Sequence, residues 1–289
     1  MNIKLHYIIS IIVFSFFIER PSNADISIVP APPKISAPSY LLMDYDSGKI
    51  LIEENIHKKL QPASLTKIMT VYVVAAELEK GTISLFDEVI VSKKAYDTLG
   101  SRMFIEIGDK VKLEDLLLGV IVQSGNDASV ALAEHISGSE EVFASLMNQH
   151  AFHLGMKNTQ FANSTGMPVK DLEHITTSYD LAILARAFIK NYPKIYELHK
   201  IKEFTYGADP PIKQYNRNKL LWRDKSVDGI KTGYTEEAGY CLVASAIRDD
   251  MRLISVVMGA GGERRNEEWQ DHKERRQDNG QQNIAGSRQ

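Results

Sequence analysis

Strand-like segments lie near both ends of this chain, with helical segments between them, and this order constrains the fold more than any other feature. The pattern predicts an N-terminal hairpin, with strands at 40–44 and 49–55 around the turn Asp46-Ser47-Gly48. Three further strands are predicted at 227–233, 239–247 and 252–258. Such segregation favours an α/β domain of the α+β type, in which one antiparallel sheet joins N-terminal and C-terminal strands and is covered by helices.

Four intervening segments have the apolar spacing and end signals of helices. The first, 64–80, follows Pro62 and ends before Gly81, and its apolar residues predict deep burial. The others are predicted at 113–121, 128–136 and 178–190. We see no internal repeat and no linker within 39–262, so we expect a single domain over 39–268.

The N-terminus has the layout of a secretory signal peptide, predicted over 1–24. Lys4 precedes an apolar stretch at 8–18, and Ser22-Asn23-Ala24 offers small residues before a cleavage site at Asp25. The stretch is short for a membrane span, although an uncleaved anchor is the alternative. Either interpretation predicts a protein of the periplasm or cell envelope. A proline-rich leader over 25–38 is expected to be extended.

The C-terminal segment differs in composition from the rest. From position 263 onward the apolar side chains are Trp269, Ile284 and Ala285, among many polar and charged residues. Such a segment cannot bury an apolar face, so we predict a polar, disordered tail over 269–289. A frameshift or gene decay would produce such a tail, and the nucleotide sequence would test that hypothesis.

Composition excludes several classes of function. A net charge of −3, spread over both signs, speaks against a nucleic-acid binder. The one cysteine, Cys241, excludes an internal disulfide and is predicted to be a buried small side chain. The eight histidines show no metal-ligand spacing, and no Walker loop or His-Glu-x-x-His motif is present. We therefore expect chemistry without a metal or cofactor.

Three short motifs could carry that chemistry: Ser64-Leu65-Thr66-Lys67, Ser124-Gly125-Asn126 and Lys231-Thr232-Gly233. Alone, each has an ordinary structural interpretation as a helix cap, a turn or a strand end. Together they predict a nucleophile with its base. Ser64 and Lys67 are three apart and share one helical face. A serine hydroxyl needs a nearby base, and lysine becomes one when burial and a second cation lower its pKa.

The other two motifs predict the remaining parts of the site. Lys231 is the expected second cation, and Ser124 could relay a proton to the leaving group. Asn126 could bind a substrate amide, and Thr232 could bind a carboxylate. Gly233 would leave room for a peptide beside the strand. The backbone N–H groups of Ser64 and Tyr234 are the expected oxyanion donors.

The three motifs together are typical of the active-site serine penicillin-recognising enzymes. The segments 61–67, 216–222 and 227–235 resemble those of low-molecular-mass serine D-alanyl-D-alanine carboxypeptidases. The resemblance implies the penicillin-binding/β-lactamase-like fold and assigns Arg217 to the terminal carboxylate of the substrate. It implies that Ser64 is acylated by peptidoglycan stem peptides ending in D-Ala-D-Ala, and that β-lactams trap this acyl-enzyme.

The sequence departs from that family in two places. Many relatives have histidine where this chain has Tyr234, and relatives continue beyond 260 into an amphipathic helix, often followed by a β-rich domain and a membrane anchor. Here the start of that helix is visible at 263–268, but the apolar positions then disappear. The sequence leaves membrane contact open.

Three alternatives remain at this point. A β-lactamase of class A would need a carboxylate for deacylation, and Glu173 is the candidate, without the usual surrounding pattern. A D,D-endopeptidase of the same fold would cut cross-links instead of releasing D-alanine. A decayed, non-catalytic penicillin-binding remnant is the third.

Overall fold

The computed structural model describes residues 35–207 and 210–261. Within them lies a five-stranded sheet in the order β2-β1-β9-β8-β7, antiparallel at every pairing. Its strands are β1 (Ser39–Asp44), β2 (Ile50–Glu54), β7 (Val227–Thr235), β8 (Gly239–Arg248) and β9 (Met251–Ala260). The predicted union of N-terminal and C-terminal strands is confirmed, since Tyr40 of β1 pairs with Val257 of β9.

The predicted signal peptide (1–24), most of the leader (25–38), the end of the predicted domain (262–268) and the tail (269–289) lie outside the described residues. Among the described residues, the helices are all too short or too polar to cross a membrane.

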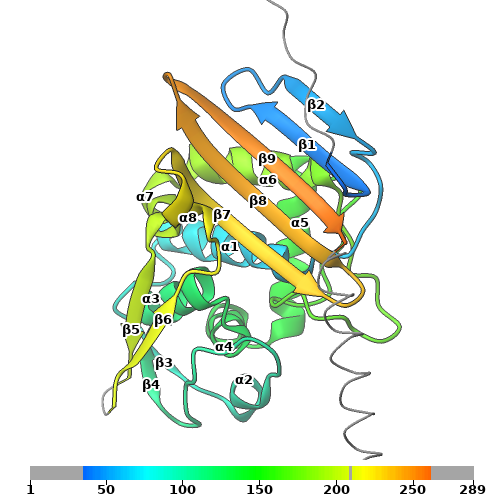
Figure 1. Cartoon of the computed structure of the whole chain (residues 1–289). Coiled ribbons are helices and arrows are strands. Elements are labelled where there is room, and N and C mark those ends of the chain that lie inside the picture. Colours follow the sequence, from blue (N-terminus) through cyan, green and yellow to red (C-terminus); the bar gives the residue numbers. More distant parts are fainter. Residues whose placement is uncertain (1–34, 208–209, 262–289) are drawn as a thin grey trace, which may run out of the picture. The chain divides into compact units, whose positions relative to one another are not determined.

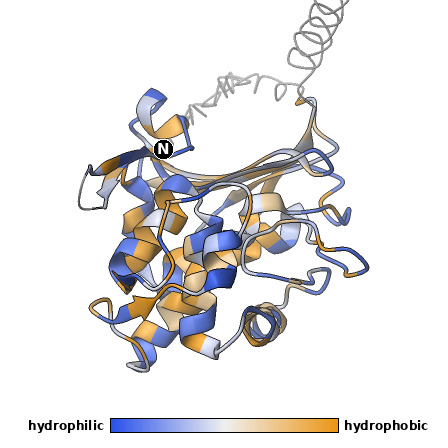
Figure 2. Cartoon of the chain, turned by 90° about the horizontal axis from the view of Figure 1, so that it is seen from below, coloured by the Kyte–Doolittle hydropathy of each residue, from blue (hydrophilic) through white to orange (hydrophobic). Residues whose placement is uncertain are grey.

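Helices cover one face of the sheet (Figure 1). The longest are α1 (Lys67–Lys80), α4 (Asn126–Ser137), α5 (Glu140–Leu154) and α6 (Ser178–Asn191). Figure 2 shows helices gathered on one side of the sheet, with both hydrophobic and hydrophilic residues among them. The core lies between them and the sheet: Leu41 and Met43 of β1 and Val256 of β9 are buried with α1 residues such as Ile68.

The remaining helices and strands of the described residues are shorter. They are α2 (Lys93–Asp97), α3 (Leu113–Leu118), α7 (Pro193–Tyr196), α8 (Leu220–Arg223), and the two small hairpins β3 (Glu88–Ile90) with β4 (Lys110–Lys112) and β5 (Glu203–Tyr206) with β6 (Ile212–Tyr215). Short tight or widened turns lie at η1 (Ala63–Thr66), η2 (Gly119–Gln123) and η3 (Glu197–Lys200).

Two predicted helices differ from the structure. The segment 64–80 is not one α-helix, because Ser64 lies in the 3-10 turn η1 and α1 begins at Lys67. The segment 113–121 changes after Leu118 from an α-helix to a π-helical turn. Such turns alter the direction of the backbone. Here η1 contains Ser64, and η2 ends directly before Ser124. Cys241 is buried and free, as predicted.

Candidate active site

The turn η1 brings Ser64 and Lys67 together. Lys67 Nζ lies 3.1 Å from Ser64 Oγ, because residues three apart share one side of a helical turn. Lys67 is completely buried, whereas Ser64 is partly exposed. The pair thus joins a partly exposed serine to a fully buried amine.

Lys67 Nζ has two further neighbours, and both are hydrogen-bond acceptors. The side-chain oxygen of Asn126 lies at 2.7 Å and the backbone carbonyl of Thr165 at 2.6 Å. A neutral amine has two N–H bonds and one lone pair. When the N–H groups point to these two oxygens, the lone pair faces Ser64 Oγ.

The surroundings of Lys67 favour that neutral form. Burial holds the pKa of Lys67 well below its ordinary value, and the positive charge of Lys231 lowers it further. Burial, together with the charge of Arg217, lowers the pKa of Lys231 to about 7. Lys231 is thus among the charges that lower the pKa of Lys67, the role expected for the second cation.

The second motif lies at the end of η2, with Ser124 in a left-handed conformation (φ 64°). Its side chain is almost completely buried, and its hydroxyl has no hydrogen-bond partner among the described residues. Buried hydroxyls are normally paired, so this one is available to a bound molecule. Asn126, predicted to bind a substrate amide, contacts Lys67 and donates from Nδ2 to the carbonyl of Leu99 at 2.6 Å.

The third motif lies on β7, which is an edge strand of the sheet. Lys231 is buried, and its Nζ donates to the carbonyl of Thr232 at 3.0 Å. Gly233 lies against η1, and an added β-carbon would be 3.2 Å from the Ser64 backbone nitrogen. Tyr234 is 54% exposed, and its ring packs 4.6 Å from that of Tyr240. Among the described residues β7 pairs with β8 on one side, so its other edge is the rim of the sheet.

Arg217 lies in the segment between β6 and α8, held by two buried asparagines. Asn216 accepts from the Asn218 backbone, and Asn218 Nδ2 donates to the Gly229 carbonyl on β7 at 3.0 Å. The guanidinium is exposed, and its Nε donates to the Gln123 carbonyl, next to Ser124, at 3.1 Å. This contact brings Arg217 beside the second motif, and its charge lowers the pKa of both lysines.

Sequence reasoning missed the loop of Asn163-Ser164-Thr165-Gly166. Asn163 Oδ1 accepts from the backbone N–H groups of Thr165 and Gly166, an arrangement typical of asparagine in turns. Gly166 has φ 88°, and a β-carbon there would lie 1.8 Å from the Ala63 carbonyl oxygen. The turn composition is a sequence signal for a loop, but a backbone acceptor such as the Thr165 carbonyl has none.

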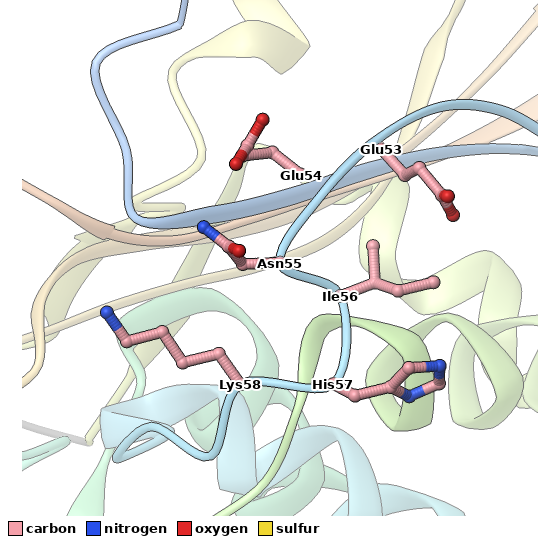
Figure 3. Close-up of a pocket in the computed structure, with 6 residues that line it drawn as sticks. All are labelled: Glu53, Glu54, Asn55, Ile56, His57 and Lys58. Atoms are coloured by element: carbon pink, nitrogen blue, oxygen red, sulfur yellow. The ribbon is translucent and has the colours of Figure 1, made fainter.

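Other candidate positions lie apart from this chemistry. Glu173, the carboxylate that a class A β-lactamase would need, is exposed. Within the described part of the chain, no group of three or more His, Cys, Asp or Glu side chains could hold a metal ion. A surface hollow after β2 is lined by residues 53–58 (Figure 3), and none of them belongs to the predicted site.

Comparison with known proteins gives matches over most of the chain. The D-alanyl-D-alanine carboxypeptidase family (Peptidase S11) matches residues 27–262. The D-alanyl-D-alanine carboxypeptidase DacC of Escherichia coli (strain K12) is 49% identical over 239 residues, which are 80% of this chain and 58% of that protein. The chain thus spans less than two thirds of the length of that relative.

A solved structure and a more distant relative also match most of this chain. The crystal structure of penicillin binding protein 5 from Haemophilus influenzae superposes with a TM-score of 0.76 at 44% identity, covering 81% of this chain and 68% of that one. The D-alanyl-D-alanine endopeptidase of Escherichia coli (strain K12) is 29% identical, over 80% of this chain and 73% of that protein. The predicted fold class is confirmed.

Proposed function

Because the chain belongs to the D-alanyl-D-alanine carboxypeptidase family, we propose that it is a serine D,D-carboxypeptidase that removes the terminal D-alanine of peptidoglycan stem peptides. One observation carries the proposal: Lys67 Nζ lies 3.1 Å from Ser64 Oγ while its two other contacts are acceptors. This is the arrangement that a serine nucleophile and a neutral lysine base require.

Acylation would begin when Ser64 Oγ attacks the carbonyl carbon of the penultimate D-alanine. The hydroxyl proton passes to Lys67 Nζ as the new C–O bond forms. The oxygen of the attacked carbonyl takes up negative charge, and the backbone N–H groups of Ser64 and Tyr234 stabilise it. Ser64 lies in the first turn of a helical segment, where N–H groups lack intrahelical partners.

The leaving D-alanine needs a proton on its nitrogen when the C–N bond breaks. The unpaired hydroxyl of Ser124 would donate it and would regain a proton from the lysines. The terminal carboxylate of the substrate would lie near the hydroxyl of Thr232 and the positive charges of Lys231 and Arg217. Water then hydrolyses the ester: Lys67 takes a proton from the attacking water and returns one to Ser64 Oγ as the ester C–O bond breaks. β-Lactams would acylate the same hydroxyl and remain attached.

Labelling with a fluorescent penicillin tests this proposal, with Ser64→Ala compared against the exposed Ser145→Ala as a matched control. The proposal predicts labelling of the wild type and the control and none of Ser64→Ala. Release of D-alanine from a stem-peptide mimic, set against cleavage of a cross-linked dimer, then separates carboxypeptidase from endopeptidase. A folded wild-type protein that takes no label would contradict an active enzyme and favour the non-catalytic alternative.

We further propose that the protein works in the periplasm or cell envelope after removal of residues 1–24. Its substrate, the stem peptide, lies outside the cytoplasm. Mass spectrometry of the protein from the cell envelope should give Asp25 as the first residue. Recovery of the intact N-terminus would favour the uncleaved anchor instead.

A further inference from the structure

We propose that Glu140 is a positioning residue for acylation: through Ser164 it fixes the Thr165 carbonyl that holds Lys67 Nζ beside Ser64 Oγ. This inference rests on the proposed function, in which Lys67 takes the proton of Ser64. Glu140 lies on a separate helix, α5, and its side chain has no hydrogen bond to Ser64 or Lys67 in the described structure.

The carboxylate of Glu140 lies in the first turn of α5 and faces the loop. Its Oε1 accepts two hydrogen bonds from Ser164, from the backbone nitrogen at 3.1 Å and from the hydroxyl at 2.7 Å. Its Oε2 lies 3.2 Å from Lys94 Nζ, and the side chain is 12% exposed. A carboxylate with two donors on one oxygen and a cation on the other has a defined orientation.

Ser164 and Thr165 are bound to α1 on their other side. The Ser164 carbonyl accepts from Thr70 Oγ1 at 2.7 Å, and the Thr165 carbonyl accepts from Lys67 Nζ at 2.6 Å. Lys67 and Thr70 are one helical turn apart and share a face of α1. The loop is thus held between α5 and α1. Glu140 makes the contact from α5, and it does so at Ser164, directly before Thr165.

Loss of this carboxylate would leave buried groups without partners. Ser164 is completely buried, so its N–H and hydroxyl would have to find new acceptors, at a cost that favours movement of the loop. The bonds of Asn163 lie within the loop and do not replace this attachment. Because Thr165 follows Ser164 directly, its carbonyl would move with the loop, and Lys67 Nζ would lose its place.

The charge of Glu140 has a second measurable effect, which is on the pH dependence of acylation. Four charged groups act on Lys67 from the elements around it: Lys231 on β7, Arg217 beside β6, Asp127 on α4 and Glu140 on α5. The neighbouring His174 is itself affected by the charge of Lys67. Glu140 raises the pKa of Lys67, against burial and the cations. Neutralising it should therefore lower that pKa and move the acid limb of the acylation rate to lower pH.

Rates of acylation by a fluorescent penicillin, measured across pH on the whole chain, test both effects. We expect Glu140→Ala to slow acylation about 10- to 100-fold, as a displaced catalytic group does. Glu140→Gln keeps an acceptor for Ser164, so it should retain most of the rate while its acid limb moves to lower pH. Glu141→Gln is the matched control, since Glu141 contacts the same Lys94 but not Ser164, and it should leave rate and pH profile unchanged.

A double-mutant cycle of Glu140→Ala with Ser164→Ala tests whether Glu140 acts through Ser164. If Glu140 acts through Ser164, the losses of the two alanine variants should not add in the double variant. Wild-type rates in Glu140→Ala, additive losses, or a Glu140→Gln variant that is as slow as Glu140→Ala with an unmoved pH profile would each overturn the inference. A wild type that takes no label at all would instead reject the proposed function, and this inference with it.

Discussion

Gly233 on β7 and Ser64 in η1 are in direct backbone contact. A β-carbon at position 233 would lie 3.2 Å from the Ser64 nitrogen and 3.1 Å from the Pro62 carbonyl oxygen. These neighbours are backbone atoms, which cannot swing aside as a side chain can. The distance between the strand edge and the nucleophile is therefore set by the absence of a side chain at one position.

Gly233→Ala should consequently reduce acylation by about 10²- to 10³-fold, the usual effect of losing an oxyanion donor. The methyl group would push β7 away from Ser64 and crowd its N–H. Stopped-flow labelling with a chromogenic β-lactam measures this. Gly261→Ala, whose added carbon meets open space, is the control. An undiminished rate in Gly233→Ala would show that the two segments separate without consequence.

Replacing Lys67 by arginine keeps a positive charge but removes the base. A guanidinium is not deprotonated in proteins, so it cannot accept the proton of Ser64. We expect acylation to fall about 10²- to 10⁴-fold, without recovery at high pH. The pH profile is the decisive measurement, because a variant that regains activity in alkali must use another base.

Ser124→Ala should separate stability from activity. The hydroxyl is buried without a partner among the described residues, and such a group costs about 1–3 kcal/mol. Its removal should leave the melting temperature of the free protein unchanged or raised. Release of D-alanine should nevertheless fall at least about 10-fold, since a positioned proton donor is lost. A lowered melting temperature would indicate that the hydroxyl is bonded in solution.

Arg217→Gln should weaken binding of substrates with a free terminal carboxylate. We expect KM for the peptide acid to rise about 10-fold, the effect of losing one hydrogen bond to a charged group, with a smaller change for the corresponding peptide amide. The exposed Lys219→Gln two residues away controls for the loss of charge. Equal effects on the peptide acid and the peptide amide would show that Arg217 does not bind the terminal carboxylate.

Acid should destabilise the protein through two buried histidines. Burial lowers the pKa of His174 to about 4 and that of His199 to about 4. The unfolded chain takes up protons below about pH 6.5, where the folded form does not. Stability should therefore be full above that pH and be lost as the pH falls toward 4, by on the order of 3 kcal/mol for each histidine.

Urea unfolding between pH 7 and pH 4 measures this loss. The His174→Gln variant keeps a donor for Thr66 Oγ1. It should lose about half as much unfolding free energy between pH 7 and pH 4 as the wild type does. An unchanged loss in that variant would place the acid sensitivity elsewhere.

Much of the fold and of the site was predictable because both follow side-chain patterns. Strands β1 and β9 alternate in burial, and the three motifs hold residue types with evident chemistry. Helix α5 was missed, although Ser139 caps its first turn and Gly155 ends it. The hairpin of β5 and β6 is too short for a periodic pattern.

The remaining features of the site depend on backbone and on distance. The Thr165 carbonyl carries no sequence signal, since every residue has one. The left-handed conformation of Ser124 is uncommon for serine and is imposed by its surroundings. Glu140 lies 24 positions before Ser164, and the fold alone brings such residues together.

The order of strands in the sheet has a consequence for how the chain acquires its shape. The strand that carries Lys231 pairs with β8, β8 pairs with β9, and β9 pairs with β1, the first strand of the described chain. The sheet therefore cannot join its two halves until β9, the last strand among the described residues, has been synthesised. Contacts this distant in sequence slow folding and prolong the exposure of unpaired edges. A chain that stops before β9 would keep the pairing of β7 with β8, but neither strand would be linked to β1.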